Sequence, residues 1–200
     1  MKIGIFGGTF DPPHKGHINA CNHFLNAFSL DKLFIIPTFL PPHKEILSSS
    51  TTQNRFDMAK IAFENLSCKI EVSDIEIRRE GKSFTAETIS YFVSQGYDNI
   101  FFLCGTDMFL TLDEWYKPEY IFEHSTIVCA RRKNDNTFEK NIFEKKKQYE
   151  QQYNAKIEIL NVNIIDVSSS EIREDIAKNK TSKFLTNDVL SYIKNNNLYR

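Results

Sequence analysis

The sequence lacks long apolar runs. No stretch of its 200 residues approaches the roughly 20 consecutive apolar residues that a membrane-spanning helix needs. The chain starts with "MKIGIF" and shows no basic segment followed by a long apolar one, so we expect no signal peptide, no membrane association and a cytoplasmic location.

Cysteine is scarce and widely spaced. The four cysteines, Cys21, Cys68, Cys104 and Cys129, form no CxxC pair. This spacing is typical of free thiols in a reducing compartment and speaks against a disulfide framework or a metal site. Cys104 and Cys129 lie within apolar runs, where we expect small core residues.

The chain also lacks an excess of one charge. Its 25 basic and 26 acidic residues give a formal net charge of −1, which predicts no broad nucleic-acid-binding face. With 41% hydrophobic and 26% charged residues, the composition is that of a globular protein, and the length fits a single domain over residues 1–200. The oligomeric state is left open, a homo-oligomer included.

Apolar runs alternate with helical patterns along the chain. We expect strands at 2–6, 32–37, 69–77, 99–105 and 125–132, and helices at about 15–28, in a segment after the Ser/Thr cluster 48–52, in 83–96 ending at Gly96, and in 186–200. The charged segment 133–156 predicts an exposed amphipathic helix whose charges are mainly solvated.

Strands that are apolar throughout and alternate with helices indicate a parallel sheet covered on both faces. The expected fold class is therefore α/β, a doubly wound, mostly parallel, Rossmann-like sheet. Ligands of such sheets bind beyond the carboxyl ends of the strands. The polar clusters "GGTFDPPHKGH", "TFLPPHK", "GTDM" and "VSSSEIR" each follow a strand and so are expected at that edge.

The stretch from Gly7 to His17 offers several features that suit an anion. Gly7 and Gly8 let the backbone turn and approach a ligand closely, and the following helix presents free N–H groups. His14 and His17 are three residues apart and share a helix face. Neither GxGxxG nor GxxxxGK[ST] is present. Anion binding is favoured, a structural turn is the alternative, and a zinc pair has no evident third ligand.

Other side chains have plain structural interpretations when taken alone. Trp115, the only tryptophan, suits a core or core edge because it hides a large apolar area. Lys44 reads as a loop lysine, Asp11 as a turn residue and Arg131 as an exposed salt-bridging arginine.

Two motifs resemble those of the adenylyl/cytidylyltransferase superfamily. Residues 14–17, "HKGH", match the HxGH motif, and residues 167–173, "VSSSEIR", are similar to ISSTxxR. Within that superfamily the chain is most similar to the bacterial nicotinate-nucleotide adenylyltransferases. The stretches that carry this likeness are "IPTFLPPHK", "SDIEIRREGKSFTAET", "FFLCGTDMFLTLDEW" and "IVCARR". Phe84 stands where the family commonly has tyrosine, so one ring hydroxyl is missing.

The resemblance implies a nucleotidyltransferase fold and adenylyl transfer from ATP to nicotinate mononucleotide in NAD biosynthesis. Both substrates are small molecules, and Mg²⁺ is carried by ATP rather than by a protein site. The implied catalytic residues are His14, His17, Lys44 and Arg173. The implied ATP-binding residues are Gly7, Gly8, Thr9, Phe10, His14, His17, Gly105, Asp107, Ser168, Ser169, Ile172 and Arg173. The implied acceptor-binding residues are Lys44, Phe84, Thr85, Asp107, Trp115 and Arg131.

Alternatives to this activity remain. Another acceptor, such as nicotinamide mononucleotide or phosphopantetheine, would use the same chemistry. A nucleotide-binding module without turnover would keep the glycine turn but lose His17 or Arg173, and both are present.

Overall fold

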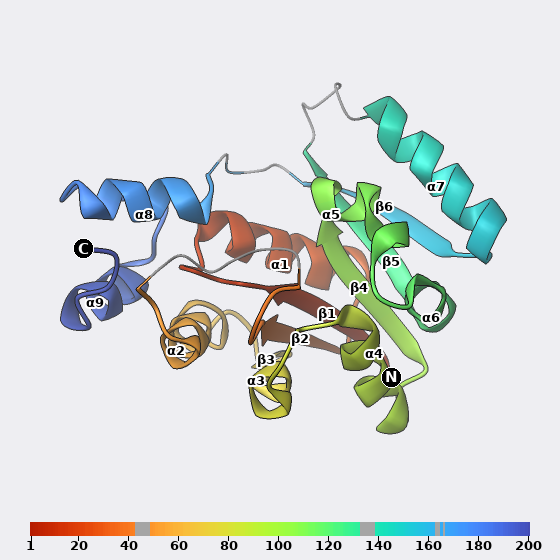
Figure 1. The fold of residues 1–200 in the computed structure, drawn as a ribbon, viewed down its shortest axis with the longest axis horizontal. Coiled ribbons are helices and arrows are strands. Elements are labelled where there is room, and N and C mark those ends of the chain that lie inside the picture. The colour runs from red at the N-terminus through yellow and green to blue at the C-terminus, as the bar shows by residue number, and fades with distance from the viewer. Residues whose placement is uncertain (43–48, 133–138, 163–164, 166) are drawn as a thin grey trace.

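The computed structural model describes residues 1–42, 49–132, 139–162, 165 and 167–200 (Figure 1). The described residues form a six-stranded sheet in which each pair of neighbouring strands is parallel. The strands are β1 (Lys2–Gly8), β2 (Lys32–Pro37), β3 (Ile70–Val72), β4 (Asn99–Gly105), β5 (Thr126–Arg132) and β6 (Lys156–Val162). Their order, β3-β2-β1-β4-β5-β6, is that of the Rossmann fold and confirms the expected fold class.

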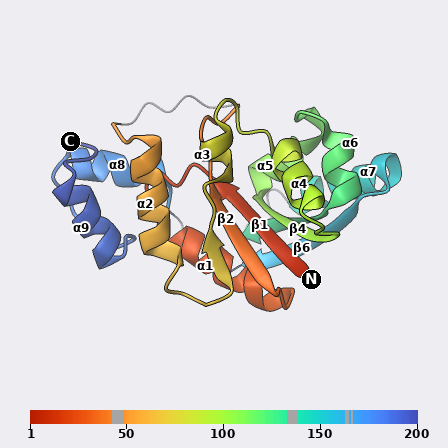
Figure 2. The same ribbon diagram turned by 90° about the horizontal axis from the view of Figure 1, so that it is seen from below.

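Helices cover both faces of the sheet (Figure 1, Figure 2). They are α1 (Lys15–Ala27), α2 (Thr52–Phe63), α3 (Ile75–Arg79), α4 (Thr85–Ser94), α5 (Thr106–Leu110), the 3₁₀ turn η1 (Leu112–Glu114), α6 (Pro118–His124), α7 (Glu139–Tyr153), α8 (Ser169–Ala177) and α9 (Asn187–Asn195). Side chains that alternate along the strands feed two apolar clusters. One cluster lies under α1, α2 and α9, and the other under α4, α6 and α7.

Most predicted elements are confirmed, and one is wrong over half its length. The expected strand at 69–77 ends at Val72, and α3 begins at Ile75. The alternation of apolar and polar residues in the sequence continues to Ile77. In the structure, however, the neighbouring residues Ile75 and Glu76 are both buried, at 6% and 5% exposure, as a helix allows and a half-buried strand does not. Gly96, with φ +85°, ends α4 as expected, in a conformation that glycine adopts without steric cost.

The buried cysteines were also predicted correctly. Cys104 and Cys129 are 1% and 0% exposed, on adjacent strands of the sheet. No disulfide joins the four cysteines, all of which lie among the described residues. No described helix combines the length and the apolar character needed to cross a bilayer.

Candidate active site

The strand order reverses between β1 and β4, and the predicted motifs gather at the carboxyl ends of these two strands. β1 ends at Gly8 and β4 ends at Gly105, the residue that precedes α5. Strand β1 pairs with β2 on one side, and β4 pairs with β5 on the other, so this is the switch point at which doubly wound sheets bind their ligands.

The two histidines form one unit at the start of α1. The His14 side chain accepts a hydrogen bond from the His17 backbone N–H at 3.4 Å, and the His17 side chain accepts one from His14 N–H at 3.2 Å. Their rings stack with centroids 3.7 Å apart and an interplanar angle of 25°. Both rings are therefore fixed as the N-terminal cap of the helix.

This capping also fixes the tautomers. Each Nδ1 accepts a backbone hydrogen bond, so in the neutral ring the proton resides on Nε2. Burial lowers the pKa of His14 to about 4, and burial together with the nearby His14 charge lowers the pKa of His17 well below its ordinary value. Near pH 7 the pair is uncharged and presents two Nε2–H donors.

The second motif lies against the first across more than 150 residues of sequence. Ser169 Oγ donates to the Pro12 carbonyl at 2.9 Å, and Arg173 Nη1 donates to the Asp11 carbonyl at 2.7 Å. Arg173 Nη2 also donates to Ser170 Oγ at 3.1 Å. The two motifs "GGTFDPPHKGH" and "VSSSEIR" are thus in contact, as expected, and the Arg173 guanidinium lies beside the segment that leads to the two histidines.

Other residues of the two motifs hold these groups in place. Ser168 caps α8 by accepting from Glu171 N–H at 3.1 Å, and Ile172 is 1% exposed in the core. The Phe10 ring is also 1% exposed, lies 5.2 Å from the His17 ring, and leaves only its backbone for a ligand. A Cβ on Gly8 would come within 2.9 Å of that ring, which requires glycine at this position.

Arg55 is a central residue that the sequence did not indicate. It is 1% exposed, and its guanidinium donates to the carbonyls of Thr9, Thr38 and Phe39 at 3.0, 2.6 and 3.0 Å. It therefore joins the segment that follows β1 to the loop that follows β2. An arginine in a helical pattern gives no signal of such burial, because charged residues usually face solvent.

The predicted acceptor-binding side chains come from the other side of the switch point. Phe84 directly precedes α4, and Thr85 is the first residue of that helix. The Phe84 ring lies 4.5 Å from the Tyr116 ring, which the sequence analysis did not single out although it neighbours Trp115. Trp115 is half-buried against the apolar cluster, with its ring 6.3 Å from that of Phe102. Its backbone follows η1, so it lies at the core edge.

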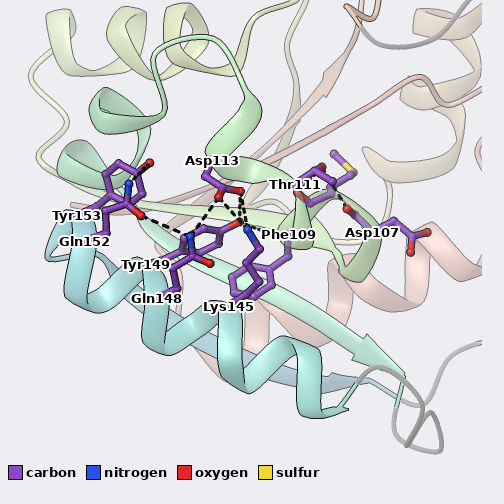
Figure 3. Close-up of polar contacts among 10 residues, drawn as sticks. Asp107, Phe109, Thr111, Asp113, Lys145, Gln148, Tyr149, Gln152 and Tyr153 are labelled. Atoms are coloured by element: carbon purple, nitrogen blue, oxygen red, sulfur yellow. Dashed lines mark hydrogen bonds and ion pairs between the residues drawn. The ribbon is translucent and has the colours of Figure 1, made fainter.

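Asp107 lies in the first turn of α5 and is exposed. Figure 3 shows its carboxylate pointing away from a polar cluster at the other end of the same segment. In that cluster Lys145 Nζ donates to both Asp113 oxygens, at 2.8 and 3.0 Å, and the Tyr149 hydroxyl donates to Asp113 at 2.9 Å. Lys145 is thus an exception to the prediction that the charges of α7 are mainly solvated, and it ties the helix to this segment.

Arg131 and Lys44 are the two remaining residues of the predicted site. Arg131, near the end of β5, donates through Nη1 to Glu139 at 2.7 Å, so the predicted salt bridge is present, but the prediction of an exposed side chain is wrong because Arg131 is only 13% exposed. Lys44 lies outside the described residues. Within the described ranges, no group of three or more His, Cys, Asp or Glu side chains could hold a metal ion.

Comparison with known proteins agrees with this arrangement. Residues 5–175 match the model of the "Cytidylyltransferase-like" family. The chain is 37% identical over 202 residues to a probable nicotinate-nucleotide adenylyltransferase of Clostridium tetani, covering 100% of this chain and 99% of the relative. It is 32% identical over 201 residues to the corresponding Caldicellulosiruptor saccharolyticus protein, covering 100% of both.

Solved structures show the same fold. The nicotinic acid mononucleotide adenylyltransferase of Plasmodium falciparum complexed with NaAD has a TM-score of 0.74 and 20% identity, covering 99% of this chain and 97% of that one. The same enzyme complexed with APC has a TM-score of 0.75 and 19% identity, covering 99% and 96%. At this level of identity the likeness concerns the fold. Together with the full-length sequence matches, it assigns this chain to the cytidylyltransferase-like family and, within that family, to the nicotinate-nucleotide adenylyltransferases.

Proposed function

We propose that this protein transfers the adenylyl group of ATP to nicotinate mononucleotide, forming nicotinate adenine dinucleotide and pyrophosphate for NAD biosynthesis. The observation that carries the proposal is the meeting of the paired histidines with Arg173 around residues 11–13 at the switch point of the sheet. A phosphate-binding loop on one motif and a cation from the other are what a triphosphate requires.

The reaction joins two substrates directly. A phosphate oxygen of the mononucleotide attacks the α-phosphorus of ATP, the new P–O bond forms, and the bond to the β-phosphate oxygen breaks to release pyrophosphate. The protein needs no covalent intermediate and contributes positioning and charge stabilisation. Mg²⁺ enters as part of the Mg·ATP substrate and neutralises phosphate charge.

His14 and His17 would serve the ATP phosphates as hydrogen-bond donors. Their capping bonds leave both Nε2–H groups for phosphate oxygens, and the stacking of the two rings places these donors side by side. The negative charge of a bound triphosphate would raise the pKa of both rings and so favour the charged donors in the transition state. We assign His17 to the charge that develops at the α-phosphate.

Arg173 would hold the β- and γ-phosphates. Its guanidinium is anchored by the Asp11 carbonyl and Ser170, which orients the planar group before ATP arrives. Ser168, Ser169 and the N-terminus of α8 would add polar contacts. Gly7, Gly8 and Thr9 would line the cleft through their backbone. Lys44 completes this proposal as a phosphate-binding cation.

The acceptor would lie between α4 and the segment that follows β4. Backbone N–H groups in the first turn of α4, which begins at Thr85, suit the nicotinate carboxylate, since Phe84 at the capping position has no side-chain acceptor for them. A carboxamide would turn its NH₂ toward these donors, which favours nicotinate over nicotinamide. Phe84 and Trp115 would contact the ring, and Gly105 and Asp107 the ribose hydroxyls. Arg131 is engaged by Glu139 and is the weakest of these assignments.

Pyrophosphate release tests the proposal directly. Purified protein with Mg·ATP would receive nicotinate mononucleotide, nicotinamide mononucleotide, phosphopantetheine or no acceptor. Release with the first acceptor alone is the expected result. Comparable release with the second would overturn the carboxylate pocket, and release only with the third would overturn the acceptor. Silence with all four would contradict the proposed activity.

We propose separately that the protein is located in the cytoplasm, a reducing compartment. Three of the four cysteines are buried free thiols, and the remaining one, Cys68, is exposed and also forms no disulfide. This state is typical of the cytoplasm, which also supplies ATP.

A further inference from the structure

The end of the chain reaches into the candidate active site. The C-terminal residues lie beside α8 and α9 (Figure 1, Figure 2). Tyr199, the residue before the last, is 6% exposed, and its hydroxyl donates to Asp11 Oδ1 at 2.6 Å. A buried tyrosine hydroxyl needs a hydrogen-bond partner, and here that partner is the Asp11 carboxylate.

Asp11 is a buried carboxylate whose partners come from distant segments. It is 4% exposed, and Ser50 Oγ donates to the same Oδ1 at 2.5 Å. Its other oxygen, Oδ2, lies 3.9 Å from Arg173 Nη1. A carboxylate in such surroundings is tolerated only when hydrogen bonds and opposite charge stabilise it. Tyr199 and Ser50 together hold one oxygen, and this leaves the other facing the arginine.

The backbone of Asp11 also contacts Arg173. The Asp11 carbonyl accepts from Arg173 Nη1 at 2.7 Å, so the residue that Tyr199 grips by its side chain is the residue that orients the guanidinium. Asp11 belongs to the turn between the glycines of β1 and His14. A displacement of Asp11 would therefore move the arginine that we assign to the ATP phosphates.

The local conformation at Tyr199 indicates that its placement is specific. Its φ is +64°, a left-handed conformation that is sterically disfavoured for residues other than glycine. Its backbone N–H donates to Ser49 Oγ at 2.9 Å, and its side chain packs in the apolar cluster under α2 and α9. These contacts hold the backbone in that conformation and direct the hydroxyl toward Asp11.

From this geometry we propose that Tyr199 is a positioning residue of the nucleotide site. Its hydroxyl fixes Asp11 and, through the Asp11 carbonyl, holds the Arg173 guanidinium in the orientation that binds the phosphates of ATP. The inference rests on the proposed function, because the nucleotide is ATP and Arg173 its partner. Tyr199 itself touches no substrate in this scheme.

The test compares Tyr199→Phe with Tyr192→Phe. Tyr192 lies in α9, and its hydroxyl donates to the Asp57 carboxylate at 2.8 Å. Asp57 belongs to α2 and not to the segment that carries Asp11 and the two histidines. Each substitution removes one hydroxyl that bonds a carboxylate. We expect Tyr199→Phe to raise the Kd for ATP and the KM for ATP about three- to tenfold. A hydrogen bond to a charged group corresponds to about ten- to a hundredfold in an equilibrium constant, and only part of this is transmitted through Asp11 to Arg173. The KM for the acceptor should stay within about twofold in both variants.

Calorimetric titration with Mg·ATP in the absence of acceptor separates this inference from the proposed activity. If the wild-type protein binds ATP but releases no pyrophosphate, the activity fails while the role of Tyr199 is still measured by Kd. The same titration in an Arg173→Ala background checks the connection through Arg173. There, adding Tyr199→Phe should leave the already weakened Kd unchanged.

Two results would overturn the inference. One is an ATP affinity of Tyr199→Phe equal to that of wild type and Tyr192→Phe. The other is a loss of affinity that persists in full when Arg173 is already alanine, since Tyr199 would then act by another path. The melting temperatures of Tyr199→Phe and Tyr192→Phe measure the loss of stability in each variant. If Tyr199 had only a structural role, Tyr199→Phe would lower the melting temperature and leave the Kd for ATP unchanged.

Discussion

Replacement of Lys145 by methionine tests how firmly α7 holds the segment between Asp107 and Trp115. Lys145 Nζ contacts both Asp113 oxygens, and Asp113 lies in η1, two residues before Trp115 (Figure 3). The side chains of Lys145 and Asp113 are 27% and 17% exposed, so water screens the pair only in part. Methionine keeps the apolar stem of lysine and removes its charge.

The expected loss of stability follows from this partial burial. Hydrogen bonds to charged groups contribute about 1.5–3 kcal/mol, and solvent screening at the exposed side reduces this, so we expect Lys145→Met to lower the free energy of unfolding by about 1–2 kcal/mol at pH 7. Lys140→Met is the matched control on the same helix. Lys140 is 84% exposed and lies 3.8 Å from Glu144, a geometry that contributes less than about 0.5 kcal/mol.

The effect of Lys145→Met should depend on pH in a defined direction. Burial alone would raise the pKa of Asp113, but hydrogen bonds from Lys145 and Tyr149 and the charge of Lys145 hold that pKa below its ordinary value. A carboxyl group with a lowered folded pKa stabilises the fold above its unfolded pKa, about 3.9. The contribution is lost as the pH falls through the folded pKa. The deficit of Lys145→Met should therefore shrink below about pH 4.

Urea denaturation of wild type, Lys145→Met and Lys140→Met between pH 7 and pH 3 measures these differences. In the same variants, the KM for nicotinate mononucleotide should rise only for Lys145→Met, because Trp115 loses its anchored neighbour. Equal stability of the two variants at pH 7 would refute the reasoning. A deficit that stays constant down to pH 3 would refute the assignment of the effect to the Asp113 carboxylate.

Three further substitutions, two of them paired with a control substitution, test the site and its support. His17→Ala should lower the turnover number by about 100- to 1,000-fold with an unchanged far-UV spectrum, whereas His23→Ala, two turns along α1, should not; near-normal turnover would remove His17 from the mechanism. Trp115→Ala should mainly raise the KM for the mononucleotide, and an unchanged KM would return Trp115 to a purely structural role. Gly4→Ala places a Cβ 2.5 Å from Leu30, so it should lower the free energy of unfolding by about 1–3 kcal/mol in denaturation experiments. Gly7→Ala, whose nearest contact is 4.0 Å away, should be tolerated with little loss of stability.

The sheet and the chemical groups of the site could be predicted because their signals are local. Strands β1, β2, β4 and β5 are short apolar runs, and their alternation with helices predicts a parallel, doubly wound arrangement. Strand β6, "KIEILNV", alternates apolar and polar residues and was not among the expected strands. The histidines and Arg173 stand in motifs that follow strands, so the topology alone brings them to one edge of the sheet. The strand predicted at 69–77 is wrong after Val72, because the same alternating sequence forms the short helix α3, in which Ile75 and Glu76 are both buried.

The residues that hold the chemical groups in place have no such signal. Arg55, Tyr199 and Lys145 each sit in polar, charged or terminal sequence that favours solvent exposure, yet the fold turns all three inward. Their partners are carbonyls and carboxylates 16 to 188 residues away along the chain, and no spacing rule spans such separations. What a residue contacts across that distance is decided by tertiary packing.

This difference has a consequence for how the site tolerates change. A triphosphate can be met only by donors and cations at fixed places, so the histidine pair and Arg173 are constrained by the ligand itself. Their supports are constrained only by the need to hold them, and a carbonyl or carboxylate can be held by a guanidinium, a hydroxyl or an ammonium. Since Asp11 is held by hydroxyls from two separate segments, loss of one donor should weaken nucleotide binding by a graded amount, whereas loss of His17 should abolish most of the turnover.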